Sequence, residues 1–510
     1  MMRKSLLASS ISACLLLSAC SLAPVYNRPD AKTDANFRQF GDTKTERSAE
    51  QGNEQIKDRW WEDLGDPVLN GLVDDALKNN QDLLRATARV DQFAATLQTT
   101  RSAYFPQIGY AAGAGRDKIP PLGATTRLNA GLTADWEIDL FGRVRSASDA
   151  AKAELLSSEE NRQAVILSLV TSVAAGYVNL RSLDLQLEIA INTAKTREDA
   201  LDLFRRRHEG GVVSGVEYAQ QESEYEAARA AIPDARQAIA IAENNLAVLT
   251  GRSSAQIPRG KAIDQLRLAA PPEGLPSELL ERRPDLRSAE QAMIAANARI
   301  GEARSQYFPQ ISLTGLFGGT SNDFDNLFDA PSRTWRYAGS ITGPIFRFGA
   351  IKGQVNAAHA RQRELLAVYQ SAIQNAFADT DRSLSQVQTT QERLEAQTRQ
   401  VGALSRYAKL ARMRYDGGYT SYIDVLDAER SLFTVQLSHA QSQADTVIAV
   451  INLYKALGGS WIEHADPQRQ QEQQEQQQEQ KNEQQAQGAA PAAAPVTPAP
   501  SSTPSASTTP

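Results

Sequence analysis

One pentapeptide occurs twice in the chain, and its repetition constrains the fold more than any other feature. Tyr-Phe-Pro-Gln-Ile is found at Tyr104–Ile108 and again at Tyr307–Ile311, 203 residues later. In both copies an alanine-rich helical pattern runs into the proline, which has no backbone N–H and ends a helix. An alternating pattern typical of a strand follows. Two copies of one long unit predict a tandem duplication.

The clearest strand pattern lies in the first copy, between Leu128 and Leu140. Apolar and polar residues alternate there, and Asp135, Glu137 and Asp139 all fall on the polar face. A strand this long, with one apolar and one acidic face, suits a membrane barrel better than a soluble sheet, whose strands average about 5–6 residues. We expect four strands in the chain, at about residues 107–115, 127–141, 310–318 and 335–348.

Long helices are expected next to the strands. Shorter ones are predicted at about Pro67–Ala103 and Pro284–Tyr307. Residues 142–209 contain no proline and predict a helix of about 100 Å, at about 1.5 Å per residue. Gly210-Gly211 breaks this pattern before a returning helix, and Gly417-Gly418 does the same in the second copy. Helices of this length indicate a coiled coil rather than a globular core.

Four strands cannot close a barrel. Open strand edges are not tolerated in lipid, because their backbone groups find no hydrogen-bond partner there. Membrane barrels begin at about eight strands, so the chain must pool strands with copies of itself. Two copies leave an interior filled by side chains, whereas three leave a lumen. We expect three, because the acidic face of Asp135, Glu137 and Asp139 requires water, and these residues are the predicted lumen lining.

The predicted fold class is therefore an α+β membrane protein. It is a tandem duplication with a long α-helical coiled-coil tunnel and four β-strands per chain, which complete a twelve-stranded trimeric β-barrel. A tunnel follows if the helices continue the barrel with a polar inner wall. A solid coiled-coil stalk is the alternative.

The first residues predict a secretory signal peptide over residues 1–19, with a basic start, a short apolar run and small residues before the cut. Leu17-Ser18-Ala19-Cys20 fits the bacterial lipobox, so Cys20 is the predicted site of lipidation and the only expected cofactor-like group is that covalent lipid. Ser21 favours the outer membrane. Residues 20–66 form the predicted lipidated arm.

Composition excludes several classes of function. The only other cysteine, Cys14, lies in the signal peptide, so no intrachain disulfide or cysteine-based metal site is possible. The net charge of −6 gives no case for nucleic-acid binding. No later window approaches 18 consecutive apolar residues, so no membrane-spanning helix is expected. Enzyme motifs are missing, and we expect no enzyme and no metal site. Residues 461–510, rich in Gln and Glu and then in Ala, Pro, Ser and Thr, are predicted to be disordered.

Taken in order, these features resemble the TolC family of outer-membrane efflux proteins, and most of all its lipoprotein branch that serves resistance-nodulation-division (RND) pumps. The residues that carry the resemblance are Leu17–Cys20, Trp60-Trp61, both Tyr-Phe-Pro-Gln-Ile copies, Asp135–Arg143, Arg282–Asp285 and Tyr415–Ala428. The resemblance covers about residues 20–460. It implies repeats at 67–251 and 284–460, joined by a connecting region at 252–283.

The resemblance also implies the partners and the gate. The family forms homotrimers that dock to a periplasmic membrane-fusion adaptor and an inner-membrane transporter, here an RND pump. Its tunnel closes at the periplasmic tip, where Asp424 and Asp427 match carboxylate rings and Tyr415 matches a gate-bonding residue. The two aspartates are three residues apart and share a helix face. Glu217 is the expected partner of Tyr415, although Thr420 replaces an arginine of the best-known member.

The predicted function is a passive exit duct in the outer membrane for drugs or other small molecules, gated at the periplasmic tip. One alternative is a duct for type I protein secretion, with lipidation and the Trp60-Trp61 arm favouring efflux. The other alternative, from a different class, is a coiled-coil envelope tether.

Replacing the lipobox cysteine tests the N-terminal prediction. Cys20→Ala removes the thiol that accepts the diacylglycerol, and labelling of cells with radioactive palmitate is expected to leave the variant unlabelled. Persistent labelling of Cys20→Ala at the wild-type level would refute the lipobox assignment.

Overall fold

The computed structural model describes residues 22–29, 59–118, 120–121, 123–254, 256–269 and 282–458. The chain divides into two units, Met1–Ile462 and Glu463–Pro510, and the second lies wholly outside the described residues. The predicted signal peptide, Cys20 and the predicted disordered tail also lie outside them.

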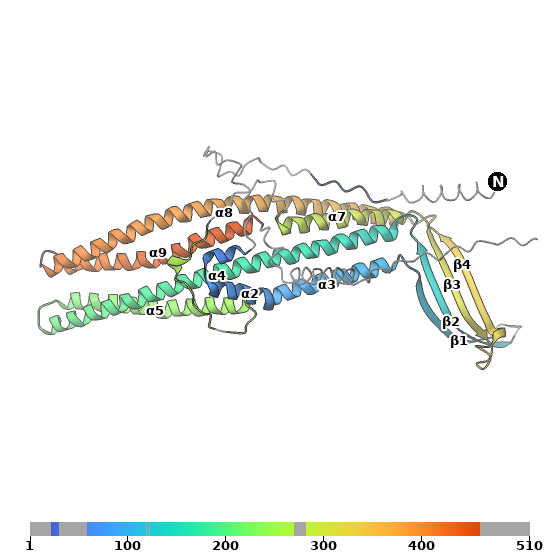
Figure 1. Ribbon diagram of the computed structural model, residues 1–510, viewed down its shortest axis with the longest axis horizontal. Helices are drawn as coiled ribbons and strands as arrows, with labels where there is room; N and C mark the ends of the chain where they lie inside the picture. The colour runs from blue at the N-terminus through green and yellow to red at the C-terminus, as the bar shows by residue number, and fades with distance from the viewer. Residues whose placement is uncertain are drawn as a thin grey trace, which may run out of the picture. The chain divides into compact units, whose positions relative to one another are not determined.

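The first unit consists of long helices and one sheet (Figure 1). The first half of the chain contains η2 (Trp60–Leu64), α2 (Pro67–Asn79), α3 (Gln81–Ser102), β1 (Gln107–Lys118), β2 (Ala124–Ile138), α4 (Arg143–Glu209), α5 (Gly215–Leu249) and η3 (Ile263–Gln265). The second half contains α7 (Pro284–Ser305), β3 (Gln310–Ser321), η5 (Ala330–Ser332), β4 (Arg333–Thr342), α8 (Ala350–Asp416) and α9 (Tyr422–Ala456).

The tandem duplication is confirmed in the order and length of these elements. Helix–strand–strand–helix–helix occurs in both halves. The two first helices, α3 and α7, have 22 residues each. The long helices α4 and α8 have 67 residues each, and the returning helices α5 and α9 have 35 each. The predicted boundary of the first long helix is correct to within one residue.

The four predicted strands form one antiparallel sheet in the order β1-β2-β3-β4. Several bounds differ from the prediction. β1 and β3 run three residues further, to Lys118 and Ser321. β4 ends at Thr342 instead of residue 348, because Gly343 and Pro344 follow and proline cannot donate to a ladder. β2 ends at Ile138, three residues before the predicted end.

The predicted single helix from Pro67 to Ala103 is wrong, because Asn80 divides it. The Asn80 side chain accepts hydrogen bonds from the backbone N–H groups of Asp82 (2.9 Å) and Leu83 (3.0 Å), so it caps α3. Its amide also donates to the carbonyl of Leu249 at 2.9 Å, at the end of α5. Asn80 therefore connects the start of α3 to the end of α5. Asp66 caps α2 in the same way, because its Oδ1 accepts a hydrogen bond from the backbone N–H of Val68 at 2.9 Å.

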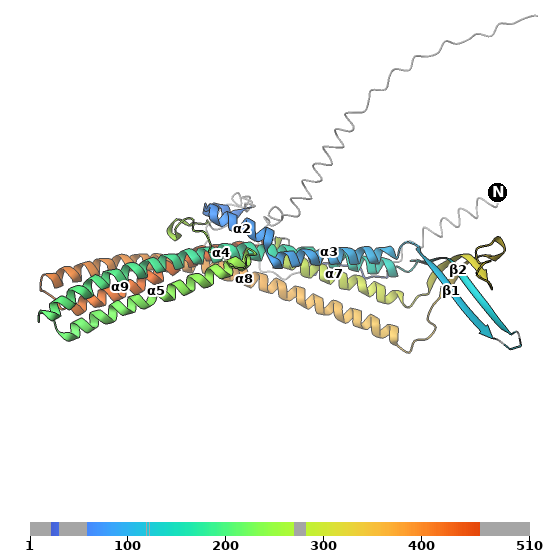
Figure 2. The same ribbon diagram turned by 90° about the horizontal axis from the view of Figure 1, so that it is seen from below.

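Helix α4 is the central element of the described chain. It contacts α2, α3, α5, α7 and α9, and Figures 1 and 2 both show it running from the sheet to the far end of the helices. It contains the one stretch of the described helices that is long and apolar enough to cross a membrane, but 61% of that stretch is buried inside the protein. This stretch is the core of a helical wall, which explains its hydropathy.

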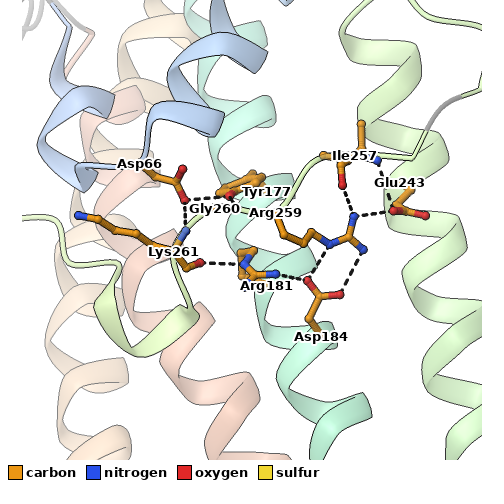
Figure 3. Close-up of polar contacts among 9 residues, drawn as sticks. All are labelled: Asp66, Tyr177, Arg181, Asp184, Glu243, Ile257, Arg259, Gly260 and Lys261. Atoms are coloured by element: carbon orange, nitrogen blue, oxygen red, sulfur yellow. Dashed lines mark hydrogen bonds and ion pairs between the residues drawn. The ribbon is translucent and has the colours of Figure 1, made fainter.

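A polar network fixes the connecting region against α4 (Figure 3). The buried Tyr177 hydroxyl donates to Asp66 Oδ2 at 2.8 Å and accepts from the N–H of Gly260 at 2.9 Å. The N–H of Lys261 also donates to Asp66 Oδ2, at 2.8 Å. Burial raises the pKa of Tyr177, so its hydroxyl keeps the proton that it donates.

A second part of the network joins two helices through one arginine. Arg259 Nε lies 2.9 Å from Asp184 Oδ2 on α4, and its Nη1 lies 2.5 Å from Glu243 Oε1 on α5 (Figure 3). Residues 256–261 therefore cross from α5 to α4. They hold these two helices together at the end opposite the Gly210-Gly211 turn. Near the start of the chain's described helices, the buried Trp60 of η2 stacks on Tyr454 of α9 at 4.9 Å between ring centroids.

Gly260 is the position in this network with no room for a side chain. A Cβ atom there would lie 2.1 Å from Asp66 Oδ1. Gly260→Ala is expected to displace Asp66 and lower stability by about 1–3 kcal/mol, measured as a fall in the melting temperature by circular dichroism. Gly353→Ala is the control, because its Cβ would meet nothing within 4 Å. Equal melting temperatures of the two variants would contradict the role of this network.

Candidate functional site at the hairpin ends

The two helical hairpins, α4–α5 and α8–α9, end in turns at the side of the molecule away from the sheet (Figures 1 and 2). Gly211 and Gly418 occupy these turns with φ of 72° and 74°, a backbone conformation that favours glycine. Ser214 and Ser421 then cap α5 and α9 with their side chains. The predicted Gly-Gly turns are thus confirmed as the ends of the hairpins.

An aromatic cluster joins the two hairpins just behind the turns. Phe204 of α4 and Tyr422 of α9 are fully buried, with ring centroids 4.3 Å apart. Tyr415 of α8 packs on both, at 6.4 Å from Phe204 and 4.9 Å from Tyr422. The Tyr415 hydroxyl accepts a hydrogen bond from Arg207 Nη1 at 3.4 Å. Tyr415 therefore bonds to the first hairpin, though to a residue that the sequence did not single out.

Glu217 does not fill the role predicted for it within the protomer. It is the third residue of α5, and its carboxylate accepts from the backbone N–H of Ser214 at 2.9 Å and from the Ser214 hydroxyl at 3.0 Å. These contacts form a capping box, which satisfies the free backbone N–H groups at the helix start. In the part of the chain that the structure describes, the expected contact with Tyr415 is not formed.

Asp424 and Asp427 both lie on the exposed face of α9, while Val425, Leu426 and Ala428 are buried. The prediction that the two carboxylates share a helix face agrees with this pattern. Asp424 accepts a hydrogen bond from Thr420 Oγ1, the residue that stands where an arginine was expected from the resemblance. Whether the two aspartates form rings depends on neighbouring copies and stays a prediction.

A buried ion pair connects α4 and α5 about three turns behind the tip. Arg197 Nη1 lies 3.1 Å from Glu224 Oε2, and the two side chains are 4% and 9% exposed. Arg197 also donates to the carbonyl of Glu224 at 2.7 Å. Arg430 of α9 binds the other carboxylate oxygen of Glu224, with its Nε at 3.0 Å. Glu224 therefore bridges the first hairpin to the second.

The surroundings of this ion pair are also buried. The Tyr422 hydroxyl donates to Gln221 Oε1 at 2.7 Å, one turn before Glu224 on α5. Burial raises the pKa of Glu429 on α9, against the opposing charge of Arg412, whose Nη1 lies 4.0 Å away. Burial likewise lowers the pKa of Arg197, and Glu224 opposes this shift. The sequence prediction missed these residues. Gln221 and Glu224 are three residues apart, so they share one face of α5, and that spacing was a possible signal.

The three acidic residues predicted to line the barrel take three different positions. Asp135 is exposed on β2. Glu137 is also on β2, but its Oε2 pairs with Arg143 Nη2 at 2.6 Å. Asp139 lies beyond the strand, and its carboxylate accepts from the backbone N–H of Arg145 at 2.7 Å, in the first turn of α4. The predicted strand to residue 141 is thus cut short by a polar junction between strand and helix.

In the part of the chain that the structure describes, no group of three His, Cys, Asp or Glu side chains is placed to hold a metal ion. The hairpin ends instead offer aromatic packing, buried charge and two exposed carboxylates. Such an arrangement holds the two hairpins together.

Comparison with known proteins decides the family. The model of the outer membrane efflux protein family matches residues 72–252 and 275–459. The chain belongs to this family. It is 35% identical to the toluene efflux pump outer membrane protein TtgC of Pseudomonas putida, over 92% of this chain and 98% of the relative. It is 33% identical to the cation efflux system protein CusC of Escherichia coli, over 88% of this chain and 97% of that protein.

Solved structures agree with this family membership. The open-state structure of the Neisseria gonorrhoeae MtrE outer membrane channel superimposes with a TM-score of 0.78 at 33% identity, over 87% of this chain and 99% of that one. The protein is thus an outer-membrane channel of an efflux system, with an α+β, tandem-duplicated fold. The family consists of transport channels rather than enzymes.

Neutralising Glu224 tests the bridge between the hairpins. Glu224→Gln leaves Arg197 buried without its counter-charge, which is expected to cost about 3–5 kcal/mol. The result would be faster cleavage near the hairpin ends in limited proteolysis and a lower melting temperature. Glu226→Gln is the matched control two residues away, because its pair with Arg229 is more than half exposed. Similar behaviour of the two variants would contradict the bridge.

Proposed function

We propose that three copies of this chain form the exit duct of a tripartite efflux pump, and that they pool their strands into one twelve-stranded barrel. The observation that carries this proposal is the sheet itself. Among the described residues, β1 pairs only with β2 and β4 pairs only with β3. Both outer edges therefore carry a row of unpaired backbone groups, which lipid does not tolerate. Pairing of β4 with β1 of the next copy removes every edge.

The side chains on the sheet support this placement. Ile108 and Tyr110 on β1 are 77% and 87% exposed in the single chain, and the stacked Trp335 and Tyr337 on β4 are 64% and 79% exposed. Large apolar side chains at this exposure need lipid or a neighbouring copy as cover. Trp335 and Tyr337 fit an aromatic girdle at the membrane surface.

The proposed gate lies at the hairpin ends. Threefold symmetry brings three copies of Asp424 and of Asp427 around one axis, where like charges in a narrow opening favour cations and repel one another. Within each copy, the Tyr415 cluster and the Glu224 bridge hold the two hairpins together, close to the threefold axis. Opening then requires the hairpins to separate from the axis while each keeps its own internal packing.

The proposed anchor is a lipid on Cys20, after removal of residues 1–19. Support comes from the arm that follows Cys20. Arg28 Nη2 pairs with Glu290 Oε2 at 2.5 Å, and the Tyr26 hydroxyl donates to Glu290 Oε1 at 3.0 Å. Asn297 donates to the carbonyl of Pro24 at 2.6 Å. Residues 22–29 thus follow α7 toward the membrane end, where a lipidated residue belongs.

The proposed partners are a periplasmic membrane-fusion adaptor and an inner-membrane transporter of the RND class. The proposed cargo consists of small molecules such as drugs or solvents. The names of the relatives, which include toluene, antibiotic and cation efflux proteins, support small-molecule efflux over protein secretion. The likeness to solved channels supports a duct over a solid tether.

Removing the tip carboxylates tests the gate. The double variant Asp424→Ala and Asp427→Ala loses the proposed rings, so purified protein in planar bilayers is expected to open more often and conduct several times more current than wild type. Asp202→Ala, near the same tip but in an exposed pair with Arg205, is the control. Absence of conductance in wild type and double variant alike would reject the duct, whereas equal conductance would reject only the carboxylate gate.

A further inference from the structure

A cavity of about 660 Å³ opens among α3, α4, α7 and α8, between the sheet and the network of Figure 3. Its residues on α4 fall between Glu154 and Ser168, whereas the network begins at Tyr177. Cavities that bind small molecules have volumes of about 300–1,000 Å³. This one is therefore large enough for an organic molecule and is separate from the hairpin ends.

The positions of residues around α7 show which face of the helical wall contains the cavity. The cavity-lining residues of α7 are Ala292, Ala295, Ala296 and Arg299. Their spacing of three and four residues places them on one side of the helix. The N-terminal arm contacts Glu290, Asn297 and Arg304. At about 100° per residue, these three lie about 150° around the helix axis from the cavity-lining residues.

The two faces of this helical wall therefore have different surroundings. One bears the arm that leads to the proposed lipid anchor, and an anchor in the bilayer must lie outside the barrel. The cavity on the opposite face then opens toward the inside of the tunnel. This step rests on the proposed function.

The charge of the cavity is basic. Its lining includes Arg89, Arg299 and Arg361 but one carboxylate, Glu154. Arg299 Nη2 pairs with Glu154 Oε1 at 2.8 Å, and Arg361 pairs with Glu364 outside the lining at 2.5 Å. Arg89 is exposed on α3, and within the described part of the chain it makes no ion pair. Arg299 also pairs with Glu302, outside the lining, at 3.2 Å. The lining thus carries two more arginines than carboxylates, and within the described residues Arg89 is the lining arginine whose charge no ion pair offsets.

The rest of the lining is suited to an apolar body. Phe93, Val165 and Leu365 are partly buried side chains from three different helices, and Ser157 and Asn161 add polar groups between them. Arginine stacks on aromatic rings and binds sulfonate or carboxylate groups through several N–H donors. Apolar and aromatic surface next to arginine is therefore the chemistry that recognises an amphipathic organic anion.

We propose that this cavity is a binding site on the tunnel wall for organic anions with an apolar ring system. Arg89 and Arg361 attract the anionic group from opposite sides, and Phe93 and Leu365 contact the rings. Three such sites surround the lumen of a trimer. They raise the local concentration of anionic cargo in the tunnel, far from the acidic hairpin ends.

The test is isothermal titration of the full-length protein in nanodiscs of zwitterionic lipid, with 2-naphthalenesulfonate as the anionic probe and 2-naphthylmethylammonium as its cationic counterpart. Wild type is expected to bind the sulfonate more tightly than the ammonium. Arg89→Gln and Arg361→Gln are each expected to weaken sulfonate binding about threefold, because each removes one partly solvated charge. Glu154→Gln is expected to strengthen it about threefold, since it removes the one carboxylate of the lining and one of the two carboxylates that pair with Arg299.

Arg363→Gln is the matched control, because it removes the same charge two residues along α8, on the opposite side of the helix and outside the lining. Equal affinity for the two probes, or the same affinity in the Arg89, Arg361 and Arg363 variants, would overturn the site. Conductance measured on the same preparation separates the two proposals. A conducting wild type that fails to bind the sulfonate rejects the site alone, whereas a binding protein without conductance rejects the duct.

Discussion

Backbone groups at a strand edge cannot remain unpaired in hydrocarbon, and this requirement shapes everything else in the structure. Each unpaired N–H or C=O costs several kcal/mol in lipid. The described part of the chain forms one sheet, whose edges at β1 and β4 are both free there. Closure by copies of the same chain satisfies both rows at once. A trimer then places three identical sets of helices around one axis.

The duplication lets one chain build two nearly equivalent sectors of that assembly. Helices of 67 and 35 residues recur in both halves, so the hairpins reach the same level before they turn. The two halves differ in how far neighbouring helices cover their long helix. α4 is packed by neighbours along its length, whereas much of α8 is exposed in the single chain. Both hairpins are fixed by an arginine at the end away from the turn. Arg259 joins α4 to α5, and Arg283 donates to the carbonyls of Ala376 on α8 at 3.5 Å and Ala456 on α9 at 3.1 Å. From the greater exposure of α8 we infer that the second hairpin is the freer of the two to move at the gate.

The sequence predicted the elements set by periodicity and by backbone chemistry. The proline after Tyr104-Phe105 and Tyr307-Phe308, the alternation in β2 and the paired glycines placed the strands and turns correctly. The break at Asn80 was missed because its reason is tertiary. The side chain that caps α3 also bonds to the end of α5, and no local pattern reveals that partner.

The candidate site was predicted only where it is exposed and local. Asp424 and Asp427 could be placed on one face from their spacing alone. The Arg197–Glu224–Arg430 bridge could not, because its members lie on three helices and their sequence neighbours resemble any charged coiled coil. Within the protomer, Glu217 contacts Ser214 instead of the expected Tyr415. A helix start offers nearby backbone N–H groups, which outcompete the more distant hydroxyl of Tyr415 for the carboxylate. Asp139 was assigned to the strand because the alternation of apolar and polar residues continues past Ile138. Its carboxylate instead accepts from a backbone N–H in the first turn of α4.

Chemical cross-linking across the two free edges tests the trimeric barrel most directly. Ala112→Cys on β1 and Ala338→Cys on β4 place one thiol on each edge strand, and a short bismaleimide can join the thiols of neighbouring copies in membranes. A barrel closed by three copies would give dimers and trimers on denaturing gels, with trimers as the largest species and only monomers when either cysteine is omitted. A doubly substituted chain that remains monomeric, or a ladder that continues beyond trimers, would contradict closure of the barrel by three copies.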